Sequence, residues 1–232
     1  MYSRSGSISL YANAYCNLPP VSANVALFLC KLCTSNGVKS DNIHIIGHSL
    51  GAQVGGIAGR NFQQNCNATI GRITGLDAAN PGFICPLCNN FRLDWNDAKF
   101  VDIIHTDVFL FGTPLKSGDI DFFVNHGGPF QPGCFDYTNE TVVSLLEDPL
   151  LILLMPVACS HQRSCYFFAE SIILNDFYAT SCSLAGNVPL QCLYIDRVYM
   201  GEYCKKRQAY DIYGVSVKAE FPYGYGPRGP LY

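Results

Sequence analysis

The most informative stretch of this 232-residue sequence is Ile43-His44-Ile45-Ile46-Gly47-His48-Ser49-Leu50-Gly51. Its isoleucines predict a short buried strand, and the Ala- and Gly-rich residues 50–60 predict a closely packed helix. A Gly-x-Ser-x-Gly pentapeptide between a strand and a helix is typical of a nucleophile elbow, in which a sharp turn exposes the serine. We therefore expect Ser49 to be a nucleophile, with the backbone N–H of Leu50 donating to a developing oxyanion. The alternative is a chance match in a glycine-rich loop.

Strands and helices are expected to alternate along the rest of the chain. A helix is predicted over residues 21–32, because apolar side chains recur there at helical spacing, Pro19-Pro20 precedes them and Asn36-Gly37 follows. Further strands are predicted at 70–76, 100–104 and 120–124, a helix at 163–174, and disulfide-tied strands beyond about residue 178. This alternation indicates the α/β class, with a mostly parallel sheet covered by helices on both faces.

A serine nucleophile needs a base, and the base needs a carboxylate that orients it. Asp77 follows the strand predicted after the elbow, at the edge where the carboxyl ends of parallel strands line a crevice. In folds with this kind of elbow the catalytic residues follow one another in the chain as serine, acid and histidine, and the position of Asp77 after Ser49 fits that order. We expect Asp77 to be the acid; the alternative is an aspartate that caps the turn Asp77-Ala78-Ala79-Asn80.

Five histidines are candidates for the base. His44 and His48 are too close to Ser49 in sequence to reach its hydroxyl across the elbow. His105 follows a buried strand and is expected to be a structural hydrogen-bonding group. His126 and His161 remain, and position favours His161, which we expect on a loop beside Cys159 that leads into a helix.

The composition indicates a globular protein of one sizeable domain, with 49% apolar and 14% charged residues. A net charge of -3 without a long basic run argues against nucleic acid as a partner. Twelve cysteines, with glycosylation sequons at Asn67 and Asn139, predict a secreted, disulfide-bonded glycoprotein. The first 18 residues show no signal peptide, and the longest apolar run, residues 149–158, is too short to be a transmembrane segment.

The chain resembles the animal pancreatic lipase family, including its single-domain invertebrate lipases and its A1-type phospholipases. The resemblance covers nearly the whole chain and rests on residues 42–52 (NIHIIGHSLGA), 75–81 (GLDAANP), 97–107 (DAKFVDIIHTD) and 159–164 (CSHQRS). It implies an α/β-hydrolase fold with Ser49, Asp77 and His161 as the catalytic triad, and it favours His161 strongly over His126.

The resemblance also implies a structural calcium site. In calcium-binding members, the positions that match Asp94 and Asp97 give carboxylates, and those that match Asn89 and Arg92 give backbone carbonyls. Oxygen ligands suit Ca²⁺. The alternative is an ordinary surface turn, and the Cys85-Pro86-Leu87-Cys88 segment departs from the family pattern. No other cofactor is expected.

Two Cys-x-x-Cys pairs, Cys30/Cys33 and Cys85/Cys88, are spaced too far apart for the usual zinc ribbon, so disulfides are the better interpretation. We expect Cys134 to pair with Cys159 and Cys182 with Cys192. The pairing of the other eight cysteines stays open.

Family members place several strands before the elbow, and the 48 residues that precede Ser49 cannot hold them. We therefore expect residues 1–232 to be a partial α/β-hydrolase domain that is incomplete at its N-terminus and has no C-terminal β-sandwich. The loop that gives the first oxyanion N–H would then be missing too, which leaves the activity of this chain open.

Residues 135–158 are expected to form a lid, because they make a long loop, closed by a disulfide, whose many apolar side chains are unfavourable in contact with water. Such a lid can cover an acyl-binding cleft or present its apolar face to a lipid–water interface. The sequence thus predicts a secreted serine carboxylic-ester hydrolase that acts on lipid esters, first a triacylglycerol lipase and second an A1-type phospholipase. A catalytically inactive lipid-binding or yolk-type storage relative is the alternative of another class.

Overall fold

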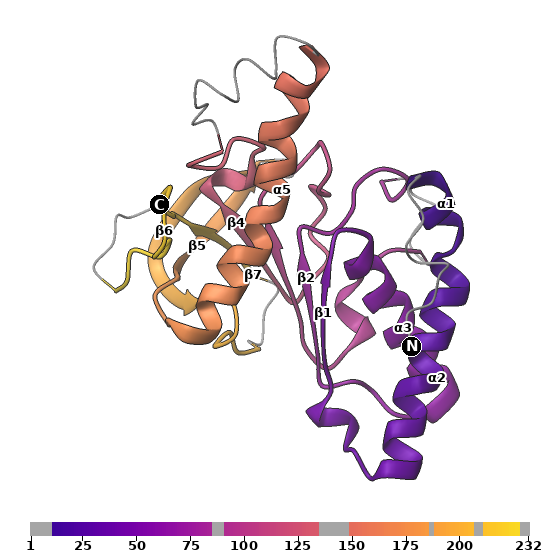
Figure 1. Ribbon diagram of the computed structural model, residues 1–232. Coiled ribbons are helices and arrows are strands. Elements are labelled where there is room, and N and C mark those ends of the chain that lie inside the picture. Colours follow the sequence, from indigo (N-terminus) through magenta and orange to yellow (C-terminus); the bar gives the residue numbers. More distant parts are fainter. Residues whose placement is uncertain (1–10, 85–90, 135–148, 186–187, 207–210, 228–232) are drawn as a thin grey trace.

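The computed structural model describes residues 11–84, 91–134, 149–185, 188–206 and 211–227 (Figure 1). Its helices are α1 (Tyr11–Cys16), α2 (Leu18–Asn36), α3 (Leu50–Cys66) and α5 (Pro149–Ile173), with 3-10 turns at Ser40–Asn42, Trp95–Asp97 and Asn125–Gly127. Its strands are β1 (His44–His48), β2 (Arg72–Leu76), β3 (Val101–His105), β4 (Ile120–Val124), β5 (Tyr178–Ala185), β6 (Val188–Tyr199) and β7 (Asp211–Val215).

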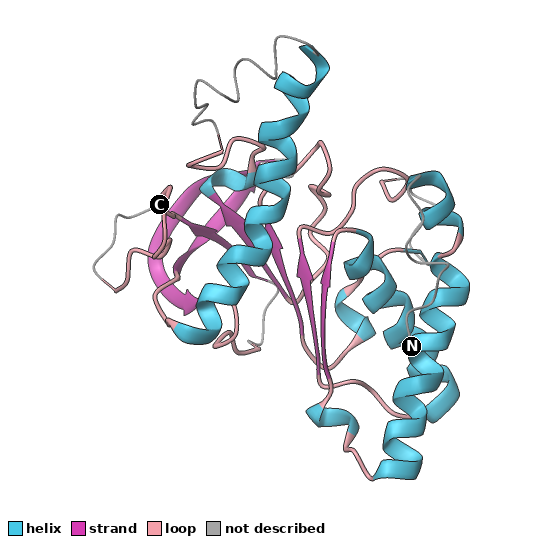
Figure 2. Cartoon of the chain, viewed as in Figure 1, coloured by secondary structure: helices cyan, strands magenta, loops and turns pink. Residues whose placement is uncertain are grey.

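The strands form one seven-stranded sheet in the order β1-β2-β3-β4-β7-β5-β6. The pairs β1–β2, β2–β3, β3–β4 and β4–β7 are parallel, whereas β5 pairs antiparallel with both β6 and β7. Helices α1, α2 and α3 lie on one side of the sheet and α5 lies on the other (Figure 2). The predicted α/β class with a mostly parallel sheet is confirmed.

Alternation along each strand divides the core between the two faces of the sheet. On β3, Ile103 packs into the cluster that includes Leu29 of α2 and Phe62 of α3. Its neighbour Ile104 packs into the opposite cluster, with Phe167 of α5. Successive side chains of a strand point to opposite faces, so a strand that is apolar at every position needs helices on both sides.

Helix α2 has the ends that the sequence predicts. Pro19-Pro20 occupies its first turn, and Gly37 follows it in a left-handed conformation (φ 69°), with its N–H donating to the carbonyl of Leu32. Helix α2 is also long and apolar enough, by length and composition alone, to cross a membrane. Core helices of soluble proteins and signal sequences pass the same test, and α2 is joined to α3 by a Cys30–Cys66 disulfide.

The largest departure from the sequence prediction is α5. A helix was expected from residue 163, yet α5 begins at Pro149 and runs to Ile173, with Pro156 inside it. A proline removes one backbone donor and disfavours a helix interior, which made an earlier start hard to foresee. Residues 149–158 of the predicted lid are therefore helical, and residues 135–148 lie outside the described part of the chain.

Three disulfides tie the described elements together. Cys134–Cys159 and Cys182–Cys192 join the pairs expected from the sequence, and Cys30–Cys66 adds a third that the sequence left open. Among the described cysteines, Cys16, Cys33 and Cys165 are outside these disulfides. Cys85 and Cys88 lie outside the described residues.

Candidate active site

Ser49 stands on a strained turn between β1 and α3. Its backbone has φ 56° and ψ -123°, a conformation that a serine adopts only when its surroundings enforce it. A Cβ at Gly47 would collide with the carbonyl of Gly51, so only glycine fits there. The Ser49 N–H donates to Leu76 O at 3.0 Å, and Ala79 N–H donates to Ser49 O at 3.1 Å. These bonds fix the turn beside the end of β2.

Asp77 follows β2 directly and is fully buried. Its Oδ1 accepts the backbone N–H groups of Thr106 and Asp107, at 2.8 and 3.1 Å. Its Oδ2 lies 2.6 Å from Nδ1 of His161. The carboxylate is therefore held by two backbone donors, and its remaining oxygen faces the histidine.

His161 lies within helix α5, so the expectation of a loop position is wrong. Because Nδ1 donates to Asp77, the second ring nitrogen, Nε2, is left to accept a proton. The ring packs 4.3 Å from the ring of His48 and 5.5 Å from that of Phe111, centroid to centroid. Nε2 of His48 also donates to the carbonyl of His161 at 3.1 Å, and burial, followed by the nearby His161, lowers the pKa of His48.

The structure thus places Asp77 against His161, and the turn of Ser49 is hydrogen-bonded to Leu76, the residue before Asp77. Ser49 Oγ makes no hydrogen bond to His161 in the described part of the molecule, and such contacts often tighten only when substrate binds. His126, the other candidate base, is exposed in the 3-10 turn after β4. His105 is fully buried between Asp121 (2.8 Å) and the carbonyl of Thr113 (3.0 Å), a structural position.

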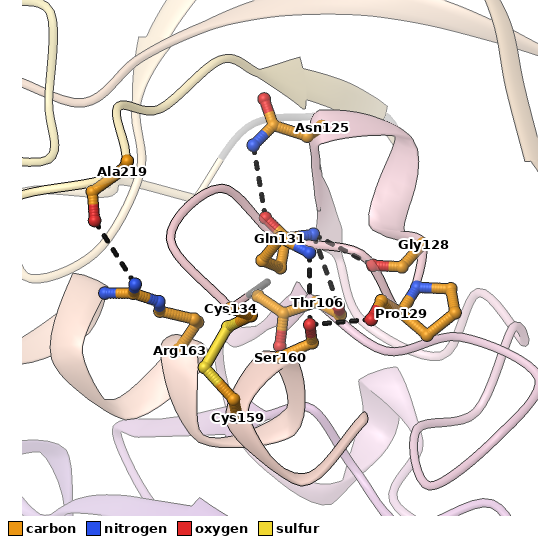
Figure 3. Close-up of a disulfide and its surroundings, with 10 residues drawn as sticks. All are labelled: Thr106, Asn125, Gly128, Pro129, Gln131, Cys134, Cys159, Ser160, Arg163 and Ala219. Carbon is orange, nitrogen blue, oxygen red and sulfur yellow. Dashed lines mark hydrogen bonds between the residues drawn. A yellow bond between two sulfur atoms is a disulfide. The ribbon is translucent and has the colours of Figure 1, made fainter. Parts of the chain in front are cut away.

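A clamp next to His161 was not foreseen from the sequence. Cys159 is bonded to Cys134, and Ser160 accepts the N–H of Gln131 and donates to the carbonyl of Pro129 (Figure 3). The side-chain amide of Gln131 donates to the carbonyls of Thr106, Val124 and Gly128. The clamp therefore ties the turn of α5 that carries His161 to the segment after β3 that binds Asp77.

Asp107 is a second buried carboxyl group beside Asp77, and no sequence motif predicts it. It is fully buried, and its Oδ2 accepts Phe111 N–H at 3.2 Å, while Oδ1 has no hydrogen-bond partner in the described residues. Burial, and then the charge of Asp77, raises the pKa of Asp107 to about 8. Its position two residues after the next parallel strand, one strand along from Asp77, is the signal that could have identified it.

Two of the predicted calcium ligands bind the guanidinium group of Arg60 instead. Arg60 donates to both carboxylate oxygens of Asp97, at 2.7 and 3.0 Å, and to the carbonyl of Arg92 at 2.7 Å. Asp94 caps the 3-10 turn by accepting Asn96 N–H. Burial raises the pKa of Asp97 to about 7 although Arg60 opposes this. Two of the expected donor groups thus bind a guanidinium as they stand.

The other predicted site residues are the oxyanion donor, the glycosylation sites and the fourth calcium ligand. Leu50 is the first residue of α3, where the backbone N–H has no acceptor within its own helix. Asn67 is exposed at the end of α3, whereas Asn89 and Asn139 lie outside the described residues. An apolar cavity of about 270 Å³ borders the elbow and is lined by Ala14, Asn17, Leu18, Val21, Leu50, Gly51 and Val54.

Comparison with known proteins shows the family to which the chain is similar. The model of the family described as Lipase matches residues 3–213. Over 190 residues the chain is 41% identical to pancreatic lipase-related protein 2 of Rattus norvegicus and to pancreatic triacylglycerol lipase of Oryctolagus cuniculus. Each alignment covers 78% of this chain, but 38% and 39% of the relatives. The pancreatic triacylglycerol lipase of Sus scrofa is 41% identical over 185 residues, covering 76% of this chain and 39% of its own length. The chain thus spans less than two-fifths of these relatives.

Proposed function

This chain belongs to the pancreatic lipase family, and from that premise we propose that it is a secreted serine carboxylic-ester hydrolase that acts on lipid esters. The observation that carries the proposal is the 2.6 Å contact between Asp77 Oδ2 and His161 Nδ1, next to a serine on a strained strand-to-helix turn. A buried carboxylate that holds an imidazole in one tautomer is the arrangement that activates a serine.

The proposed reaction assigns one role to each of four groups. Ser49 Oγ attacks the acyl carbonyl while Nε2 of His161 takes its proton, and Asp77 stabilises the imidazolium. The N–H of Leu50 donates to the oxyanion of the tetrahedral intermediate. His161 then returns the proton to the leaving alcohol. A water molecule, activated in the same way, releases the fatty acid from Ser49.

Triacylglycerol is the proposed preferred substrate, and phospholipid is the second candidate. The pancreatic triacylglycerol lipases among the relatives support the first choice. The lid proposed over residues 135–158 would act at the lipid–water interface. An inactive lipid-binding relative is disfavoured, because Ser49, Asp77 and His161 are all present.

We also propose that the protein is secreted and that it can bind a structural calcium ion. Three disulfides support an oxidising compartment. Calcium would be a structural ion only, held by Asp94, Asp97 and the carbonyls of Arg92 and Asn89. The described donors do not fit a calcium ion as they stand, since Arg60 already donates hydrogen bonds to Asp97 and to the carbonyl of Arg92.

The proposal is tested by labelling the chain, expressed in an oxidising host, with a fluorophosphonate probe. Ser49→Ala should abolish both labelling and fatty-acid release from emulsified triacylglycerol. Ser22→Ala is the matched control, because Ser22 is a buried serine of α2 outside the site. Labelling that survives Ser49→Ala would refute the assignment, and faster release from phosphatidylcholine than from triacylglycerol would favour the phospholipase.

A further inference from the structure

The carboxyl group of Asp107 is not needed by the triad, yet it lies beside it. Ligand atoms of Asp77, Asp107 and His161 all lie within 4.8 Å of one another, and all three residues are buried. Asp107 Oδ1 has no hydrogen-bond partner in the described part of the chain. A fully buried carboxyl oxygen without a partner is unfavourable, so this oxygen indicates that the cluster can accept something more.

The three groups offer one imidazole nitrogen and two carboxylate oxygens. Zn²⁺ binds nitrogen and oxygen donors at about 2.0–2.2 Å, which places neighbouring ligand atoms of a tetrahedral site roughly 3.3 Å apart. The present contact of 2.6 Å between His161 and Asp77 would need to open, and Asp107 would need to approach. Ca²⁺ and Mg²⁺ prefer oxygen ligands alone, so the histidine favours a transition metal.

We propose that Nδ1 of His161 and the carboxylates of Asp77 and Asp107 form an inhibitory site for Zn²⁺. The inference rests on the proposed function for the effect on activity, whereas the binding of the ion does not depend on it. The two backbone N–H groups that hold Asp77 Oδ1 can remain in place, because the zinc-binding oxygen is Oδ2.

Inhibition follows from the tautomer that the ion imposes. Zn²⁺ on Nδ1 takes the place of the proton that Nδ1 now donates to Asp77. The neutral ring has only one N–H proton, so this proton is relocated, by exchange with solvent, from Nδ1 to Nε2. Since Nε2 is the atom that has to accept the proton of Ser49, the base is blocked without any change at the serine.

The way into the site predicts slow inhibition. Asp77 and Asp107 are fully buried, and the His161 side chain is 10% exposed. The turn that begins at Asp107 is closed by two backbone hydrogen bonds, Phe109 N–H to Gly112 O at 3.0 Å and Gly112 N–H to Asp107 O at 2.9 Å. We expect zinc to enter only when this turn opens, so that inhibition develops with time and is reversed by a chelator.

The experiment measures zinc binding directly in the 232-residue protein. Accessible thiols are first alkylated, because free cysteines also bind zinc. The protein is then titrated with Zn²⁺ against a fluorescent zinc indicator. Asp107→Asn should weaken the thiol-independent affinity by about tenfold or more. Asp176→Asn is the matched control, since Asp176 also has a buried carboxyl oxygen without a partner but is not in the cluster, and it should leave the affinity unchanged.

A second measurement does not depend on a variant that folds. Co²⁺ bound to the wild-type protein should give the absorption of a tetrahedral site of nitrogen and oxygen ligands, without a thiolate-to-cobalt charge-transfer band. Such a band, or an affinity that Asp107→Asn leaves intact, would overturn the proposal. Zinc binding that is sensitive to Asp107 in a chain without esterase activity would support the site and count against the proposed function, so the two failures are distinguishable.

Discussion

Asp77 and Asp107 follow neighbouring parallel strands, β2 and β3, and both are fully buried. Three hydrogen bonds hold the carboxylate of Asp77: two from backbone N–H groups and one from His161. The carboxyl group of Asp107 accepts one, from Phe111. The same residue type at the same kind of strand end thus orients a histidine in one place, and in the other keeps an oxygen without a hydrogen-bond partner in the described residues. Partners, rather than topology, make the difference.

The largest effect is expected at Asp77. Asp77→Asn should lower kcat for ester hydrolysis about 10⁴-fold, because an amide no longer holds His161 in the required tautomer. Asp107→Asn is the matched control and should cost far less, since Asp107 makes no hydrogen bond to the imidazole in the described residues. Equal losses in the two variants, measured with a soluble short-chain ester, would remove the distinction between the two strand ends.

A smaller effect is expected at Gly112, which lies against the carboxylate of Asp77. A Cβ at this position would collide with all three atoms of that carboxylate group. Gly112→Ala should therefore displace Asp77 and lower kcat about 10²-fold. Gly128→Ala is the control, because a Cβ there meets nothing within 4 Å. If Gly112→Ala has wild-type kinetics, the position of Asp77 is less restricted than the structure indicates.

The pKa of Asp107 gives a pH dependence of stability. Burial and the nearby Asp77 raise this pKa from 3.8 to about 8, so the folded state binds more protons than the unfolded state between these values. The free energy of unfolding should fall as the pH rises through this window. The melting temperature, followed from about pH 5 to about pH 8.5, should decline less steeply in Asp107→Asn. Asp97 and Asp176, whose pKa values are also raised, contribute with the same sign and remain in both proteins.

The smallest effect is expected from removal of calcium, and it extends the comparison to a third buried aspartate. Asp97 already binds Arg60 through both oxygens. EGTA should therefore shift the melting temperature by less than about 1 °C, because the guanidinium supplies the positive charge. Arg60→Gln removes that charge, and a melting temperature that then rises with added calcium would show that the ion can take its place. A large EGTA effect on the wild-type protein would mean that Arg60 leaves Asp97 when calcium binds.

Much of the architecture was predictable because short local sequence patterns determine where its strands and helices begin and end. The isoleucines before Ser49, the prolines that open α2 and the Gly37 that ends it predicted elements that the structure confirms. The start of α5 was not predictable, since Pro156 argues against a helix interior and yet α5 begins at Pro149 and runs through it. The partner of Cys30 was equally open, because a disulfide between residues 36 apart depends on how α2 packs against α3.

The sequence by itself determined the elbow, the order of serine, acid and histidine, and the parallel sheet, because each depends on neighbours in the chain or on a fixed period. Only the tertiary structure decided which groups surround the histidine. The Gln131–Ser160 clamp, the position of Asp107 and the pairing of Arg60 with Asp97 join segments that are 29 or more residues apart. Contacts of this kind leave no local pattern, since they exist only after the strands have brought their carboxyl ends to one edge of the sheet.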